Sequence, residues 1–98
     1  MRTPARAPKK MTNMKIKYSE KATKQFSAVL KTDRKSAVRI LDKIERYAEN
    51  PKGRFDIKPL RGKHGTLLRL RVGDYRIILE TIEGTVFVYE ILQRQEAY

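Results

Sequence analysis

The sequence predicts a single small α+β domain, in which two helices cover one face of an antiparallel sheet. Three patterns predict it: an alternating N-terminal segment, two amphipathic helical segments in succession, and three β segments separated by short turns. A chain of 98 residues suffices for one domain with a modest core. The predicted element order is β-α-α-β-β-β, in which the last three strands form an antiparallel meander.

The first 13 residues have the composition of a disordered basic tail. They are poor in large apolar groups and carry two prolines and four basic residues. The alternative is an assigned start that lies too far upstream, with Met11 or Met14 as the true start. The domain is expected over residues 14–98. It opens with a strand, because Met14, Ile16 and Tyr18 alternate with lysines.

Capping residues and breakers delimit the two predicted helices. Ser19 is a good N-cap for the first, and Thr32-Asp33 ends that helix and caps the next. The second helix ends at Asn50-Pro51, because the residue before proline disfavours helical geometry. Its apolar residues recur at spacings of three and four, which predicts a core-facing stripe of Ala37, Ile40, Leu41, Ile44, Tyr47 and Ala48.

A basic loop is predicted over residues 51–65. Three strands follow over residues 66–72, 75–80 and 85–92, with tight turns at Gly73-Asp74 and Glu83-Gly84. Residues 93–98 form a short polar tail.

Charge is the main guide to function. The formal net charge is +12, which predicts an anionic partner: a nucleic acid, an acidic protein or an anionic membrane. There is no cysteine and only one histidine, so we expect no disulfide, no metal site and no cofactor. No apolar run reaches the ~18–20 residues that span a bilayer, and no signal peptide is evident. The expected location is the cytoplasm, without membrane association.

Arginines gather on the predicted meander and around it. If Leu68, Leu70 and Val72 face the helices, Arg69 and Arg71 face outward. Guanidinium groups grip phosphate bidentately and stay charged at any useful pH. The candidates for phosphate binding are therefore Arg61, Arg69, Arg71, Arg76 and Arg94. The alternatives are a merely solvated outer face at Arg69 and Arg71, and a structural ion pair of Arg76 with Asp74 or Glu80.

Conventional acid–base groups are scarce. His64 has no histidine partner, so it is either a general base or an incidental loop residue. An enzyme built on this chain would depend on electrostatic stabilisation and positioning. Tyr98 is either a base-stacking residue or a frayed terminal one.

Three segments together resemble the RelE/ParE superfamily of bacterial toxins: residues 60–62 (LRG), 69–76 (RLRVGDYR) and 93–98 (QRQEAY). The resemblance covers residues 14–98. It implies the toxin of a type II toxin–antitoxin pair, neutralised by a protein antitoxin. RelE-like members cut mRNA in the ribosomal A site, whereas ParE-like members inhibit DNA gyrase.

The resemblance also implies roles for particular residues. The catalytic set is Arg61, Arg69, Arg76, Arg94 and Tyr98, and the expected RNA-binding residues are Lys52, Arg54, Lys58, Lys63 and Arg71. The chain departs from the family pattern at two positions. Leu67 stands where a proton-transferring lysine is expected, and Gln93 stands where many relatives have histidine. His64 or Lys63 is the candidate replacement for the general base.

The leading hypothesis is an mRNA interferase, a ribosome-dependent endoribonuclease that inhibits translation. The alternatives are a ParE-type gyrase inhibitor without nuclease activity, and a relative that has lost toxicity. The expected partners are the ribosome, mRNA and a cognate antitoxin, whose acidic amphipathic segment would lie on the basic sheet or in an apolar groove along the helices. Residues 52–63 of the basic loop are a candidate contact for RNA, for the antitoxin, or for both.

Overall fold

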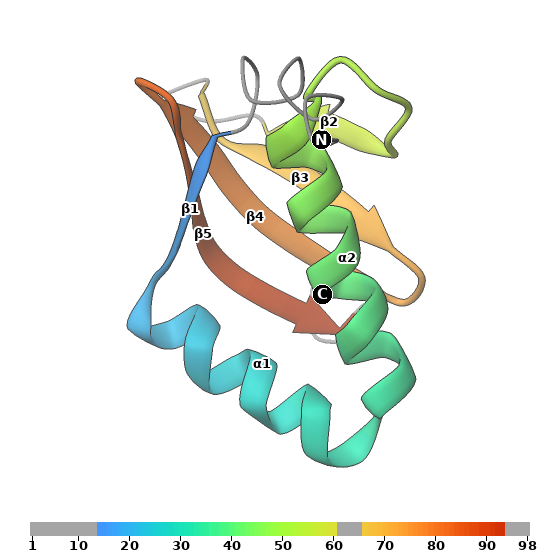
Figure 1. Ribbon diagram of the computed structural model, residues 1–98. Coiled ribbons are helices and arrows are strands. Elements are labelled where there is room, and N and C mark those ends of the chain that lie inside the picture. Colours follow the sequence, from blue (N-terminus) through green and yellow to red (C-terminus); the bar gives the residue numbers. More distant parts are fainter. Residues whose placement is uncertain (1–13, 61–65, 94–98) are drawn as a thin grey trace, which may run out of the picture.

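Within the described residues, two helices pack on one five-stranded sheet (Figure 1). The computed structural model describes residues 14–60 and 66–93. Its elements are β1 (Lys15–Tyr18), α1 (Glu20–Thr32), α2 (Arg34–Glu49), β2 (Ile57–Pro59), β3 (Leu68–Val72), β4 (Tyr75–Ile82) and β5 (Thr85–Gln93). The predicted α+β class is confirmed, including the strand, helical hairpin and antiparallel meander in that order.

The sheet is mixed, with the strand order β1-β5-β4-β3-β2. β1 runs parallel to β5, and every other neighbouring pair is antiparallel. The prediction of a continuous loop over 51–65 is wrong at Ile57–Pro59, where β2 pairs with Leu68–Leu70. These three residues show no alternation long enough to indicate a strand. Pro59 lacks a backbone donor, so it suits the end of an edge strand.

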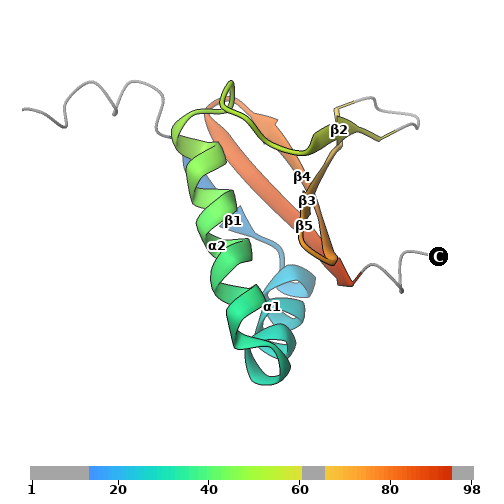
Figure 2. The ribbon, with the colours of Figure 1, turned by 90° about the vertical axis from the view of Figure 1, so that its right-hand side faces the viewer.

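The helix boundaries follow the capping signals. The Ser19 hydroxyl accepts a hydrogen bond from the Ala22 N–H at 2.9 Å, and the Asp33 carboxylate accepts one from the Ser36 N–H at 3.2 Å. Asn50 is the C-cap of α2, as the Asn50-Pro51 breaker predicts. Figure 2 shows both helices on one side of the sheet. Neither is long and apolar enough to cross a membrane.

The core lies between the helices and the inner face of the sheet. Ile40 and Ile44 of α2 are fully buried, as are Ile77 and Leu79 of β4. Leu41 belongs to the predicted stripe of α2, but it lies at the margin of the contact and is exposed. Because inward and outward side chains alternate along a strand, this core fixes which residues of β3 and β4 face away from the helices.

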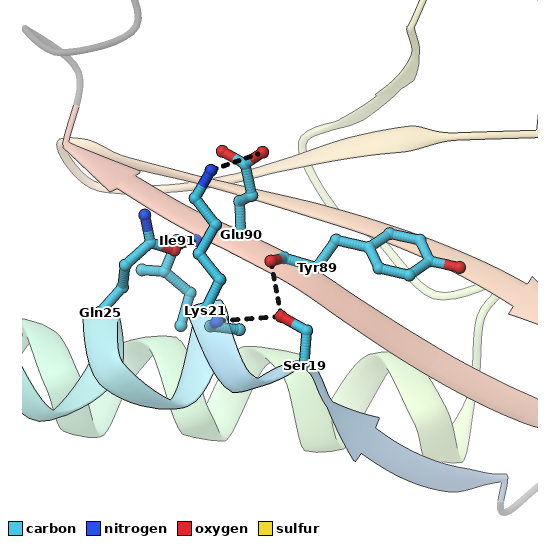
Figure 3. Close-up of polar contacts among 7 residues, drawn as sticks. Ser19, Lys21, Gln25, Tyr89, Glu90 and Ile91 are labelled. Carbon is cyan, nitrogen blue, oxygen red and sulfur yellow. Dashed lines mark hydrogen bonds and ion pairs between the residues drawn. The ribbon is translucent and has the colours of Figure 1, made fainter.

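A β-bulge in β5 is held by side chains of α1 and its N-cap (Figure 3). Ile78 pairs with Glu90 and Leu79 with Val88, so Tyr89 is the extra residue. β1 ends beside Val88, and beyond this point the edge of β5 bonds to side chains instead. The Ser19 hydroxyl donates to the Tyr89 carbonyl at 2.8 Å, and the Gln25 side-chain oxygen accepts from the Ile91 N–H at 2.7 Å.

Candidate nucleic-acid interface

Four basic residues occupy neighbouring positions on the outer face of the sheet, away from the helices. Arg71 of β3 lies directly opposite Arg76 of β4, and Arg69 lies between Lys58 of β2 and Ile78 of β4. We call Lys58, Arg69, Arg71 and Arg76 the outer basic patch. Their inward neighbours Leu70 and Ile77 are buried. The outward orientation of the arginines is therefore a consequence of core burial.

A two-residue turn sets the register of the patch. Gly73 adopts a φ of +59°, a left-handed conformation that residues with a β-carbon rarely adopt. The turn lets Val72 pair with Tyr75 and brings Arg71 opposite Arg76. Like charges directly opposite each other on adjacent strands are destabilising. The sheet thus holds an unfavourable pair of cations at this position.

Asp56 offsets part of this repulsion. Its carboxylate oxygens lie 3.7 Å from Arg69 Nη2 and 3.9 Å from Arg71 Nη1. The Asp56 carbonyl also accepts a hydrogen bond from the Arg71 N–H at 2.8 Å, which fixes the aspartate beside β3. The Arg69 side chain is only 17% exposed, whereas that of Arg71 is 37% exposed. Sequence reasoning missed Asp56, although it is the only acidic residue within the basic stretch 51–65.

Glu80 lies on the same face, four residues beyond Arg76 along β4. The Tyr89 hydroxyl donates to Glu80 Oε1 at 2.6 Å, and the Thr66 hydroxyl donates to Glu80 Oε2 at 2.5 Å. The hydrogen bond to Glu80 is the main cause that raises the pKa of Tyr89 above its usual value near 10.0. The Tyr89 hydroxyl therefore stays protonated, and able to donate, to a higher pH than that of a free tyrosine. Its ring stacks on Phe87, with centroids 6.4 Å apart.

The other predicted site residues fall into two groups. Lys52 and Arg54 are exposed on the connection that follows α2. The rest lie outside the described residues: Arg61, Lys63, His64, Arg94 and Tyr98. The structure thus brings Lys58, Arg69, Arg71 and Arg76 together and does not test their roles.

A backbone hydrogen bond joins the described residues on either side of positions 61–65. The Leu60 N–H donates to the Leu67 carbonyl at 2.9 Å, next to the last pair of β2 and β3. Leu67 is half-buried, and strand alternation places it on the same face as Arg69. Within residues 14–60 and 66–93, no three acidic or histidine side chains are grouped to hold a metal ion.

The fold and the outer basic patch define a small basic α+β protein suited to an anionic partner, and solved structures share this fold. A YafQ–DinJ complex from E. coli matches at a TM-score of 0.74 and 13% identity, covering 87% of this chain and 98% of that chain. A YoeB dimer from Staphylococcus aureus matches at 0.73 and 13% identity, covering 82% and 95%. An archaeal RelE–RelB complex from Pyrococcus horikoshii matches at 0.69 and 23% identity, covering 84% and 96%.

The sequence itself identifies the family. Residues 16–98 match the model of the ParE toxin family, described as the ParE toxin of the type II toxin–antitoxin system parDE. The chain therefore belongs to the ParE toxin family, within the RelE/ParE superfamily, and is the toxin of a type II toxin–antitoxin system. The resemblance seen in the sequence is confirmed. No curated protein sequence matches the chain.

Proposed function

We propose that this toxin is a ribosome-dependent endoribonuclease that cleaves mRNA in the A site and so inhibits translation. The observation that carries the proposal is the Arg71–Arg76 pair on the outer face of the sheet. A phosphate between two opposed guanidinium groups would turn a repulsive pair into two charge-assisted contacts. An RNA chain lying across β3 and β4 would supply phosphates to the outer basic patch in this way.

The roles follow from the chemistry of cleavage by the 2′-hydroxyl. Arg69 and Arg76 stabilise the negative charge that develops on the phosphorus centre, and Lys58 and Arg71 hold neighbouring phosphates. By resemblance to the family, Arg61 and Arg94 add charge to the same centre and Tyr98 stacks on a base. Because Leu67 replaces the expected lysine, we assign proton transfer to His64 or Lys63.

The test is induced expression of the chain, followed by growth curves and mapping of mRNA ends. Arg76→Ala is expected to lower cleavage by about 10²–10³-fold, the usual effect of removing a group that stabilises transition-state charge. Arg34→Ala, on the helical side of the molecule, is the matched control and should leave cleavage unchanged. The proposal fails if Arg76→Ala and Arg94→Ala both retain growth arrest and mRNA cleavage.

A second candidate function is inhibition of DNA gyrase without nuclease activity. The match to the ParE family favours it, and so does leucine at position 67. In a supercoiling assay with purified gyrase, a gyrase inhibitor blocks supercoiling at stoichiometric amounts. A ribosome-dependent nuclease leaves supercoiling intact and cuts message instead.

We further propose that a cognate antitoxin neutralises this chain in the cytoplasm through an acidic amphipathic segment. The RelE–RelB and YafQ–DinJ structures each contain a toxin of this fold with a second protein. On this chain, the segment would meet the outer basic patch or the exposed apolar side chains Leu30, Val38 and Leu41 of the helical hairpin. A synthetic peptide of that segment should restore growth and translation, and a peptide without effect would contradict the assignment.

A further inference from the structure

A basic cleft lies between α2 and the end of β3, beside the outer basic patch. Its volume is about 410 Å³. Three parts of the chain line it: one face of α2, the connection that precedes β2, and the last residues of β3 with the turn that follows. We call it the α2–β3 cleft. Its charged lining consists of Arg39, Lys43, Arg54, Arg71 and Asp56.

Positive charge dominates this lining. Asp56 is its one carboxylate, and its oxygens already lie near Arg69 and Arg71. Among the described residues, no carboxylate forms an ion pair with Arg39, Lys43 or Arg54. On the same helix, by contrast, Arg46 is paired with Asp42 at 2.9 Å. The cleft therefore has cations in excess of its own anions.

The cations are placed by structured parts of the fold. Arg39 and Lys43 are four residues apart on α2, so they share one face of that helix. The Arg39 guanidinium reaches toward the β3–β4 turn, where its Nη1 lies 3.9 Å from the position that a β-carbon on Gly73 would take. On the opposite side, Phe55 packs edge-on against Tyr47 of α2, with ring centroids 5.5 Å apart. This contact anchors the connection that carries Arg54.

Arg71 makes the cleft continuous with the outer basic patch. It pairs with Arg76 on the outer face and also lines the cleft. β2 pairs with β3 only at Leu68–Leu70, and the next contact at this edge is the hydrogen bond from the Arg71 N–H to the Asp56 carbonyl. Beyond it, no described strand lies beside Val72 on this edge. A strand of nucleic acid that crosses Arg76 and Arg71 can therefore pass this end of β3 into the cleft.

We propose that the α2–β3 cleft binds the phosphodiester backbone of RNA, at a phosphate flanking the one held on the outer basic patch. This inference deepens the proposed nuclease function and rests on it for the identity of the ligand. The message and the ribosomal RNA carry the same phosphate chemistry, so either one supplies the ligand.

The test measures RNA binding by the full-length chain as a function of salt concentration. The probe is a short 2′-O-methyl RNA oligonucleotide, which resists cleavage because its 2′-oxygen is blocked. Each phosphate contact to single-stranded nucleic acid contributes about 0.7 to the slope of log affinity against log salt. The cleft variant Arg39→Gln/Lys43→Gln/Arg54→Gln is expected to flatten this slope by about 1.4–2.1, as for two or three lost contacts. Arg39→Gln alone should flatten it by about 0.7.

The control variant removes the same charge elsewhere. Lys31→Gln/Arg34→Gln/Lys35→Gln changes exposed residues at the junction of α1 and α2 that do not line the cleft. Its slope should change by less than about 0.7, since only long-range charge is lost. Circular dichroism and thermal melting check that both triple variants fold.

A second arm repeats the titration with purified ribosomes. If the cleft variant flattens the salt slope more than the control variant does with the oligonucleotide, the phosphate belongs to the message. If it does so with ribosomes alone, the phosphate belongs to ribosomal RNA. The proposal is overturned if the two triple variants behave alike with both probes. This binding test does not depend on cleavage. If the slope depends on the cleft but the mapping of mRNA ends finds no cut message, the nuclease proposal alone is refuted.

Discussion

At the scale of single residues, Asp56 places a negative charge beside two arginines of the outer basic patch. It lies within 4 Å of both Arg69 and Arg71, while Arg76 sits opposite Arg71 in the register. Strand alternation let the sequence predict that Arg69 and Arg71 face outward. The sequence did not predict the contact with Asp56, because that contact depends on β2 and on its register with β3.

Replacing Asp56 should strengthen RNA binding. Asp56→Asn removes the negative charge beside Arg69 and Arg71, so affinity for RNA is expected to rise about threefold to tenfold at low salt. Asp42→Asn makes the same change of net charge on α2, where the carboxylate pairs with Arg46, and should have a smaller effect. Equal gains for the two variants in a binding titration would show that only net charge matters.

Two tyrosines should respond in opposite ways to loss of the hydroxyl. The Tyr18 hydroxyl is buried without a hydrogen-bond partner among the described residues, whereas the Tyr89 hydroxyl donates to Glu80. Tyr18→Phe should leave the free energy of unfolding unchanged or raise it by up to ~1 kcal/mol, and Tyr89→Phe should lower it by ~1 kcal/mol. Urea unfolding of both variants measures the difference, and a destabilised Tyr18→Phe would contradict this account.

The same tyrosine predicts a pH dependence. Burial, and secondarily the charge of Glu45, raises the pKa of Tyr18 above 10.0. Above pH ~10 the unfolded chain releases this proton while the folded chain retains it, so stability falls as pH rises. Tyr18→Phe should therefore weaken the loss of stability between pH 9 and about 11, measured by urea unfolding at each pH. Identical pH profiles for the variant and the parent chain would refute this.

At the scale of elements, the junction of α1 with β5 holds the bulged strand in place. Helix boundaries were predictable because Ser19, Asp33 and Asn50-Pro51 act locally on the backbone. The parallel pairing of β1 with β5 and the bulge at Tyr89 were not, since both depend on contacts between residues far apart in the sequence. Ser19 contributes both to the local helix boundary, as N-cap of α1, and to the long-range contact, as donor to the Tyr89 carbonyl.

Removing the Ser19 side chain should therefore lower the free energy of unfolding more than removing that of an ordinary surface serine. Ser19→Ala is expected to lower the free energy of unfolding by about 1–2 kcal/mol. Gln25→Ala should cost about 1–3 kcal/mol, because it removes the acceptor of the Ile91 N–H. Ser27→Ala, on an exposed position of α1, is the control and should be near neutral. Equal midpoints in urea for Ser19→Ala and Ser27→Ala would contradict the bridging role.

At the scale of the whole molecule, the positive charge belongs to the folded domain more than to its N-terminal segment. Removing residues 1–13 leaves 19 basic against 11 acidic residues, a net charge of +8. The family match begins at residue 16. Among the described residues, the fully buried core begins at Ala22, and Met14, Ile16 and Tyr18 pack against it. The division into a tail of residues 1–13 and a domain of residues 14–98 stays a prediction.

A chain that starts at Met14 tests that division. We expect it to melt within a few degrees of the full chain and to arrest growth, because the core and the outer basic patch are retained. Its RNA affinity should fall at low salt and converge with that of the full chain at high salt, since screening removes the contribution of distant charges. Failure of the shortened chain to fold would place the domain boundary upstream of Met14.

The position of β5 in the sheet has a consequence for how the toxin is made. β5 is the last strand that the structure describes, yet it lies between β1 and β4 and is the strand to which β1 pairs. During synthesis, β1 and α1 lack the strand against which they pack until residues 85–93 have left the ribosome. Pairings so distant in sequence form late. The sheet is therefore complete only after residues 85–93 have been made, and the first described strand of the chain pairs last.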